Sequence, residues 1–88
     1  MPGKLQIILA ESAAREIRKM DSRSRQRILE KLSEYRSKPE LARADLKRLE
    51  DTRDPVQYRL RVGYYRLIAA IEGDTLKILH VLHRNKAY

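Results

Sequence analysis

The sequence predicts one α+β domain over residues 1–88, with the element order β-α-α-β-β-β and two N-terminal helices packed on one face of an antiparallel sheet. Two observations lead to this fold class. Apolar residues recur at three- and four-residue spacing in the first half of the chain, and at every second position from Tyr58 onward. With 88 residues and 42% hydrophobic composition, the chain can hold one modest core, so a single domain is expected.

The first elements are a short strand and an amphipathic helix. Leu5–Leu9 alternates and is rich in Ile and Leu, which is typical of a strand. A helix follows from Glu11 or Ser12 to about Met20, because apolar and charged side chains there separate onto opposite sides at helical spacing.

A second helix and a connector come next. Asp21 or Ser22 can cap the helix, whose apolar residues repeat at helical period until Pro39 ends it. The short link between the helices implies an antiparallel pair. From Pro39 to Pro55 the sequence is charged and irregular, which predicts a connector with room for one helical turn. Three leucines are able to hold this connector to the core: Leu41, Leu46 and Leu49.

Three strands complete the predicted sheet. Tyr58–Val62 alternates between apolar and arginine side chains and ends at Gly63. Tyr65–Glu72 is apolar on both faces, as in a central strand. Gly73 and Asp74 form a turn, and Leu76–His83 is the last strand.

The composition limits the chemistry. The chain has no cysteine, which excludes disulfides, thiolate metal sites and a cysteine nucleophile and favours an intracellular, cytoplasmic protein. No apolar run approaches the roughly 18 residues of a membrane span, and the N-terminus is too short in apolar residues for a signal peptide. The two histidines and the carboxylates show no metal-ligand spacing, so neither a metal nor another cofactor is expected.

The charge is strongly positive. Twenty Lys and Arg against twelve Asp and Glu give a formal charge of +8, and 13 of the 20 cations are Arg. Because the planar guanidinium grips phosphate with two hydrogen bonds, this bias indicates a polyanionic ligand. The alternative is a solvated cationic surface without a ligand.

A two-residue loop of Gly63 and Tyr64 would fix the register of the first hairpin. It pairs Val62 with Tyr65, Arg61 with Arg66, Leu60 with Leu67 and Arg59 with Ile68. Paired residues share a face, so Arg59, Arg61 and Arg66 project together, opposite the apolar face that the helices cover. Since opposed like charges destabilise a sheet, the cluster indicates a phosphate backbone as ligand. The alternative is that these arginines pair with surface carboxylates: Glu50, Asp51, Asp54 or Glu72.

The register of the last strand has two solutions. A two-residue Gly73-Asp74 loop pairs Leu67 with His80 and turns Arg84 away from the other arginines. An offset of one residue, from a longer loop or a bulge, instead places His80, Leu82 and Arg84 on the arginine side and keeps Leu79 and Val81 in the core. We favour the offset because it avoids burying an imidazole, although the turn chemistry argues against it.

Two motifs in the C-terminal third are specific: YRLRVGYYRLI and LKILHVLHRNKAY. With the helices before them, they resemble the RelE/ParE superfamily of type II toxin–antitoxin toxins, over nearly the whole chain. The resemblance to the RelE branch implies a RelE-like fold, cleavage of mRNA in the ribosomal A site, and neutralisation by an acidic, RelB-like antitoxin. The residues that match the functional positions of that branch are Arg59, Arg66, Arg84 and Tyr88, with His83 beside them. The sequence departs from the pattern of two strand lysines, since Gln57 and Arg59 stand there.

The expected chemistry uses the 2′-hydroxyl of RNA as nucleophile and needs no metal. Arg66 and Arg84 are assigned to stabilising the negative charge of the transition state, and Tyr88 or His83 to proton transfer. The backbone of the RNA is assigned to three further cations: Arg59, Arg61 and Lys47. The antitoxin is expected to cover the arginine side of the sheet. Two other functions stay open: a ParE-like inhibitor of DNA gyrase without enzymatic activity, and a plain RNA-binding module.

Overall fold

The computed structural model describes residues 5–53 and 55–86, with nothing described for the side chain of Lys86. Strand β1 spans Gln6–Leu9 and is followed by helices α1 (Glu11–Lys19), α2 (Ser22–Ser37) and α3 (Pro39–Asp45). Four further strands follow: β2 (Lys47–Arg48), β3 (Tyr58–Val62), β4 (Tyr65–Glu72) and β5 (Thr75–His83). A 3-10 helix over Arg84–Lys86 comes after β5.

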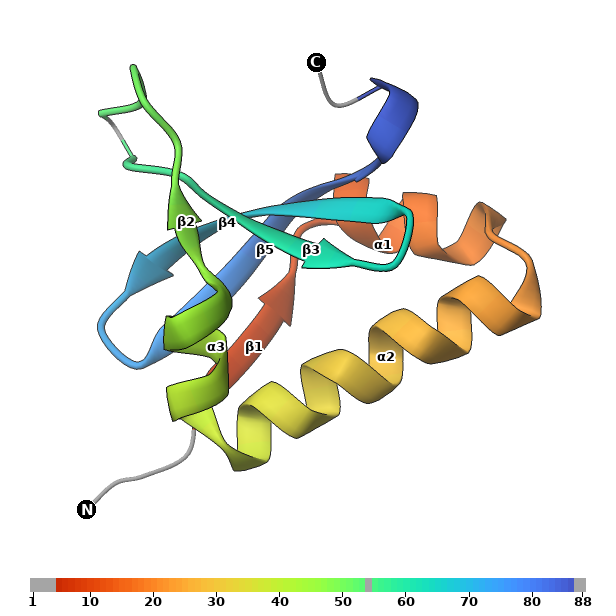
Figure 1. The fold of residues 1–88 in the computed structure, drawn as a ribbon, viewed down its shortest axis with the longest axis horizontal. Helices are drawn as coiled ribbons and strands as arrows, with labels where there is room; N and C mark the ends of the chain where they lie inside the picture. Colours follow the sequence, from red (N-terminus) through yellow and green to blue (C-terminus); the bar gives the residue numbers. More distant parts are fainter. Residues whose placement is uncertain (1–4, 54, 87–88) are drawn as a thin grey trace.

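The strands form one sheet in the order β1-β5-β4-β3-β2 (Figure 1). Neighbours from β2 to β5 are antiparallel, whereas β1 pairs with β5 in parallel. The prediction of an antiparallel sheet is therefore wrong at β1. The antiparallel pairs β3–β4 and β4–β5 are joined by tight turns, but β1 and β5 are far apart in the sequence and no hairpin constrains their direction.

The connector contains two elements that the sequence prediction missed in part. Pro39 ends α2 as expected, but it also occupies the first turn of α3, where its fixed φ and missing N–H are tolerated. Strand β2 is only two residues long, and Lys47 pairs with Arg59 and Arg48 with Tyr58. Two charged residues carry no periodicity, so the sequence could not predict this strand.

The helices cover one face of the sheet. Asp21 is the N-cap of α2, because its carboxylate accepts a hydrogen bond from the backbone N–H of Ser24 at 3.1 Å. Alternate residues of β3, β4 and β5 meet the helices in one core. The largest fully buried side chains are Tyr35, Ile28, Leu60, Leu67, Leu76 and Ile78.

The registers place the arginines as predicted. Between β3 and β4, Arg61 is opposite Arg66 and Arg59 is opposite Ile68. Between β4 and β5, the two-residue turn and the offset both occur, because Glu72 pairs with Thr75 while a bulge shifts the register between Ile68 and Ala69. The physical reason is that a bulge absorbs one residue after a tight turn.

Leu79 is the residue that the bulge absorbs. Ile78 pairs with Ala69 and His80 with Ile68, which leaves Leu79 without a cross-strand partner. Val81 is buried as expected, but Leu79 is only half-buried and lies outside the core cluster, so its assignment to the core was wrong. His80 is exposed, as the offset requires, and its Nδ1 lies 3.3 Å from the hydroxyl of Ser12.

Candidate functional site

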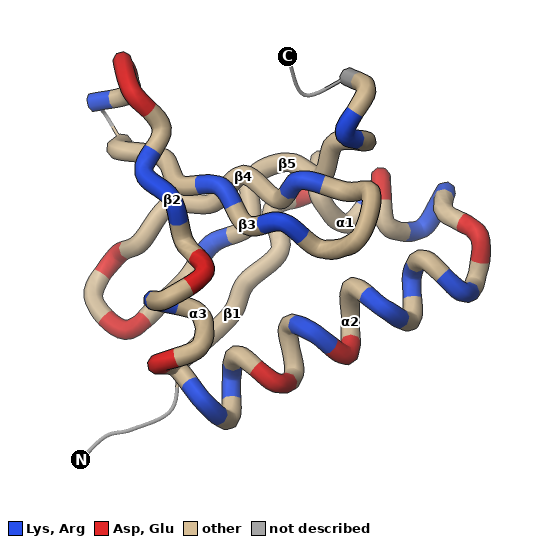
Figure 2. The backbone as a smooth tube through the Cα atoms, viewed as in Figure 1, with Lys and Arg blue, Asp and Glu red and all other residues tan. Residues whose placement is uncertain are grey.

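Three arginines share the side of the sheet that faces away from the core. We call this surface the arginine face and define it by Arg59, Arg61 and Arg66. Figure 2 shows Lys and Arg close together on β2, β3 and β4, which contribute Lys47 opposite Arg59 and Arg61 opposite Arg66. The face therefore concentrates cations from three neighbouring strands.

Arg66 is the buried member of the face. Its side chain is 8% exposed, and its Nη1 donates to the carbonyls of Tyr65 at 3.0 Å and Gly63 at 3.3 Å. Its Nε is buried without a hydrogen-bond partner among the described residues. Loss of hydration lowers the pKa of Arg66 from its usual value, and the charges of Arg61, Arg59 and Arg84 lower it further. Such a group gains strongly from a bound anion.

The described carboxylates do not neutralise Arg61, Arg66 or Arg84. Ion pairs within the described ranges join Arg15 to Glu11, Lys19 to Glu16 and Lys31 to Glu34, all on α1 or α2. The alternative of ordinary surface pairing with Glu50, Asp51 or Glu72 therefore finds no support for these three arginines, and Asp54 lies outside the described residues.

Arg84 reaches the site from the 3-10 helix and not from the last strand. Its backbone N–H donates to the carbonyl of Tyr64 at 2.7 Å, and its guanidinium carbon lies 5.0 Å from the centre of the Tyr64 ring. Its charge contributes to the lowered pKa of Arg66. The structure therefore groups Arg84 with the arginine face, although β5 has already ended at His83.

His83 lies at the end of β5 between two tyrosines. It is opposite Tyr65, whose ring meets it edge-on at 5.4 Å, and its ring stacks with Tyr64 at 6.3 Å. This register turns His83 toward the helix side, away from Arg66. Its Nδ1 accepts a hydrogen bond from the backbone N–H of Asn85 at 3.3 Å. The other ring nitrogen, Nε2, is therefore the one that can contact a ligand. Tyr88 lies outside the described residues.

Sequence reasoning missed three residues of this region. Tyr64 is 60% exposed beside Arg84, and the doubled tyrosine in the hairpin turn was the available signal. Lys31 and Asp45 line a hollow of about 360 Å³ together with three expected residues, Lys47, Arg59 and Arg61, and with Ala44. No local pattern links α2 and α3 to β3, so these two residues could not be found from the sequence.

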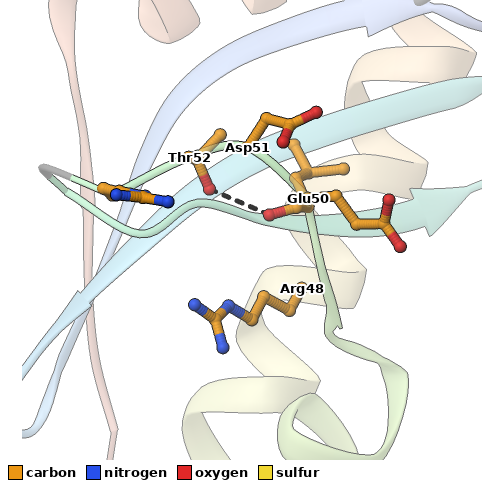
Figure 3. Close-up of a pocket in the computed structure, with 6 residues that line it drawn as sticks. Arg48, Glu50, Asp51 and Thr52 are labelled. Carbon is orange, nitrogen blue, oxygen red and sulfur yellow. Dashed lines mark hydrogen bonds between the residues drawn. The ribbon is translucent and has the colours of Figure 1, made fainter.

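A second hollow, of about 460 Å³, lies in the loop after β2 (Figure 3). The Thr52 hydroxyl closes this loop, since it donates to the carbonyl of Leu49 at 3.0 Å and accepts from the backbone N–H of Gln57 at 2.9 Å. Figure 3 shows the side chains of Arg48, Glu50 and Asp51 pointing in different directions. Because opposite charges line it and do not converge, we assign the loop a structural role.

The described residues offer neither a metal site nor a membrane-spanning helix. Over residues 5–53 and 55–86, no group of three or more His, Asp or Glu side chains is placed to hold a metal ion. In the same ranges, no helix is long and apolar enough to cross a membrane.

Helices on one face of a five-stranded sheet, with arginines gathered on the other, define a toxin of the RelE/ParE superfamily. The family model described as the ParE toxin of the type II toxin–antitoxin system parDE matches residues 7–88. The chain belongs to this family, and the resemblance seen in its sequence is confirmed.

Solved structures agree on the fold. RelE–RelB from Pyrococcus horikoshii OT3 shares 24% identity over 97% of this chain and 100% of that chain, with a TM-score of 0.74. RelB–RelE from Methanococcus jannaschii shares 26% identity over 92% of this chain and 94% of that chain, with a TM-score of 0.73. RelBE2 from Mycobacterium tuberculosis shares 27% identity over 93% of this chain and 100% of that chain, with a TM-score of 0.65. Comparison with curated proteins gives no match.

Proposed function

We propose that this toxin is a metal-independent endoribonuclease that cuts mRNA in the ribosomal A site and thereby inhibits translation in the cytoplasm. The observation that carries the proposal is Arg66, a nearly buried guanidinium whose Nε has no hydrogen-bond partner among the described residues and whose pKa is lowered by burial and by three neighbouring arginines. Burial of a charge among like charges costs free energy, whereas a dianionic phosphorane bound there would be stabilised by it. The similarity to RelE chains of 26% and 27% identity supports the same branch.

In this mechanism the 2′-hydroxyl attacks the adjacent phosphorus, and the 5′-oxygen of the next nucleotide leaves with a proton. Arg66 and Arg84 stabilise the charge on the phosphorane oxygens, because guanidinium stays protonated and binds two oxygens at once. His83 and Tyr88 are the candidates for moving protons. Lys47, Arg59 and Arg61 hold the flanking backbone. With so few acid and base groups, much of the rate comes from the ribosome orienting the RNA.

The partner that restrains this activity is an acidic antitoxin. The P. horikoshii and M. jannaschii relatives are complexes with RelB, and a chain of charge +8 attracts an acidic segment. We expect the antitoxin to lie over the arginine face and to stabilise the domain by mass action. Hydrogen exchange on the complex checks this, and neutralisation that leaves the arginine face unprotected would contradict it.

The experiment that tests the activity is primer extension on a translated message, with and without ribosomes. The proteins are the wild type, Arg66→Ala, Arg66→Lys and a control, Arg36→Ala, which changes an exposed arginine of α2. Ribosome-dependent cuts should persist in the control and disappear in Arg66→Ala while its circular dichroism stays native. If the wild-type protein leaves the message uncut with ribosomes present, the proposed endoribonuclease activity is rejected.

A second candidate function is inhibition of DNA gyrase through protein contacts. The match of residues 7–88 to the ParE toxin model favours it. A supercoiling assay with purified gyrase separates the two, because a gyrase inhibitor should act without ribosomes and should tolerate Arg66→Ala.

A further inference from the structure

The hollow beside the arginine face combines cations with one carboxylate. It is lined from α2 by Lys31, from α3 by Ala44 and Asp45, from β2 by Lys47 and from β3 by Arg59 and Arg61. Strand β2 pairs only with Tyr58 and Arg59, so β2 leaves the edge of β3 at Arg61 uncovered. A volume of about 360 Å³ falls at the lower end of the range of small-ligand pockets, about 300 to 1,000 Å³.

Asp45 is held in a fixed orientation. Its Oδ2 accepts a hydrogen bond from the Tyr35 hydroxyl at 2.6 Å, and the Tyr35 side chain is fully buried in the core. This contact uses one of about four acceptor positions of the carboxylate. Lys31 is held as well, by Glu34 at 2.9 Å and by its position over the Tyr35 ring at 5.3 Å. The hollow therefore presents a preoriented acceptor among donors.

A carboxylate weakens a site that only has to bind phosphate, so Asp45 indicates a ligand with N–H donors. Guanine offers two adjacent donors, N1–H and the 2-amino group, to a carboxylate, and its O6 and N7 accept from Arg or Lys. Adenine and cytosine place one amino group next to an acceptor nitrogen, and uracil flanks its N3–H with two carbonyls. Of the four bases, guanine matches the lining best.

We propose that this hollow reads an unpaired guanine next to the phosphates held on the arginine face, with Asp45 as the residue that selects the base. Single-stranded RNA is commonly recognised through the Watson–Crick edges of splayed bases. The inference rests on the RNA-binding part of the proposed function and adds a base preference and its determinant.

The test is direct binding of RNA that cannot be cut. Fluorescence anisotropy is measured with 2′-O-methyl heptamers of uridine that carry G, A, C or U at the central position. We expect the wild type to bind the G oligomer about tenfold more tightly than the U oligomer. Asp45→Asn should reduce this ratio to about twofold or less. Asp51→Asn makes the same charge change on the loop after β2 and should keep the ratio, since asparagine tolerates the positive φ of 66° there.

Equal affinities for the four oligomers in the wild type, or an unchanged ratio in Asp45→Asn, would overturn the proposal. Mapping ribosome-dependent cuts separates this result from the activity. If Asp45→Asn and the wild type cut the message at the same bases, the guanine site is rejected and the endoribonuclease activity is retained. If the wild type prefers the G oligomer, Asp45→Asn abolishes this preference and neither protein cuts the message, the guanine site is supported and the endoribonuclease activity is rejected.

Discussion

At the scale of single residues, the features of Arg66 that favour binding of an anion lower the stability of the folded protein. Its guanidinium is nearly buried, its Nε finds no hydrogen-bond partner in the part of the chain that the structure describes, and it is repelled by Arg61, Arg59 and Arg84. Replacing a poorly compensated buried charge with an apolar side chain of similar length often stabilises a protein. We therefore expect a bound anion to stabilise the folded protein at this site.

Arg66→Met should raise the midpoint of thermal unfolding and weaken binding to RNA. The reason is that methionine fills the same space without desolvating a charge. Differential scanning calorimetry and anisotropy measure the two effects. Arg61→Met at the exposed opposite position is the control and should change the midpoint little. A lower midpoint for Arg66→Met would show that its two hydrogen bonds outweigh the burial.

Tyr35→Phe should lower the free energy of unfolding by about 1.5 to 3 kcal/mol, the usual contribution of a hydrogen bond to a charged acceptor. Burial and the Asp45 carboxylate raise the pKa of Tyr35 above its usual value of 10. The stability from this group is thus present below pH 10 and is lost as the pH rises toward the folded pKa. Urea unfolding at pH 8 and at pH 11 should show a smaller difference between wild type and variant at pH 11.

At the scale of elements, the register of the β3–β4 hairpin was predictable, that of the β4–β5 hairpin stayed between two solutions because of its bulge, and long-range pairings were not predictable. The two-residue loop at Gly63, with its φ of 57°, set the β3–β4 register that places Arg61 opposite Arg66. The parallel pairing of β1, the strand at Lys47 and the hollow around Asp45 depend on contacts between distant segments. Residue spacing carries no information about such contacts, whereas the residues of a tight turn determine the register of the two strands that the turn joins.

The bulge at Leu79 should be removable. Without Leu79, Ile78 and His80 become neighbours and still pair with Ala69 and Ile68, so both sides of β5 keep their register. Deleting Leu79 should cost about 1 kcal/mol of unfolding free energy. Amide spectra should keep the wild-type pattern at His80 and beyond.

Deletion of Leu82, which is also half-buried, is the matched control. It moves His83 opposite Arg66 and Arg84 opposite Tyr65, so both change face. This variant should lose the Tyr65–His83 contact and bind RNA more weakly. If the Leu79 deletion proved as damaging as the Leu82 deletion, the bulge would be a required part of the strand.

The cap of α2 gives a pH-dependent prediction. Hydrogen bonds from the Ser24 side chain and backbone hold the pKa of Asp21 below its usual 3.8. The stability from this cap is therefore present above pH 3.8 and is lost as the pH falls through the folded pKa. Asp21→Ala should unfold at lower urea concentration than the wild type at pH 7, and this difference should shrink as the pH falls below 3.8. Asp21→Asn keeps the cap without titrating and should remove the pH dependence.

At the scale of the whole molecule, we expect the positive charge to dominate the proposed binding of RNA. Single-stranded RNA releases counterions, so the logarithm of the affinity falls with the logarithm of salt concentration with a slope of about −0.7 for each neutralised phosphate. Four phosphates, one shared by Arg66 and Arg84 and one each for Lys47, Arg59 and Arg61, give a slope of about −3. Arg61→Ala should reduce it to about −2, and Arg36→Ala should leave it unchanged. A wild-type slope near zero in anisotropy titrations would argue against a phosphate-binding face.

The parallel pairing of β1 with β5 has a consequence for how the domain folds. The first strand of the sheet and the last are neighbours, and β5 lies between β1 and β4. Until β5 exists, β1 has no partner strand and the helices that follow it have little to cover. Closing this contact brings together segments almost a whole chain length apart, which slows folding and makes it all-or-none. Arg84, directly after β5, reaches its place beside Tyr64 only in that final step, so the chain completes its cluster of arginines and gains its stability together.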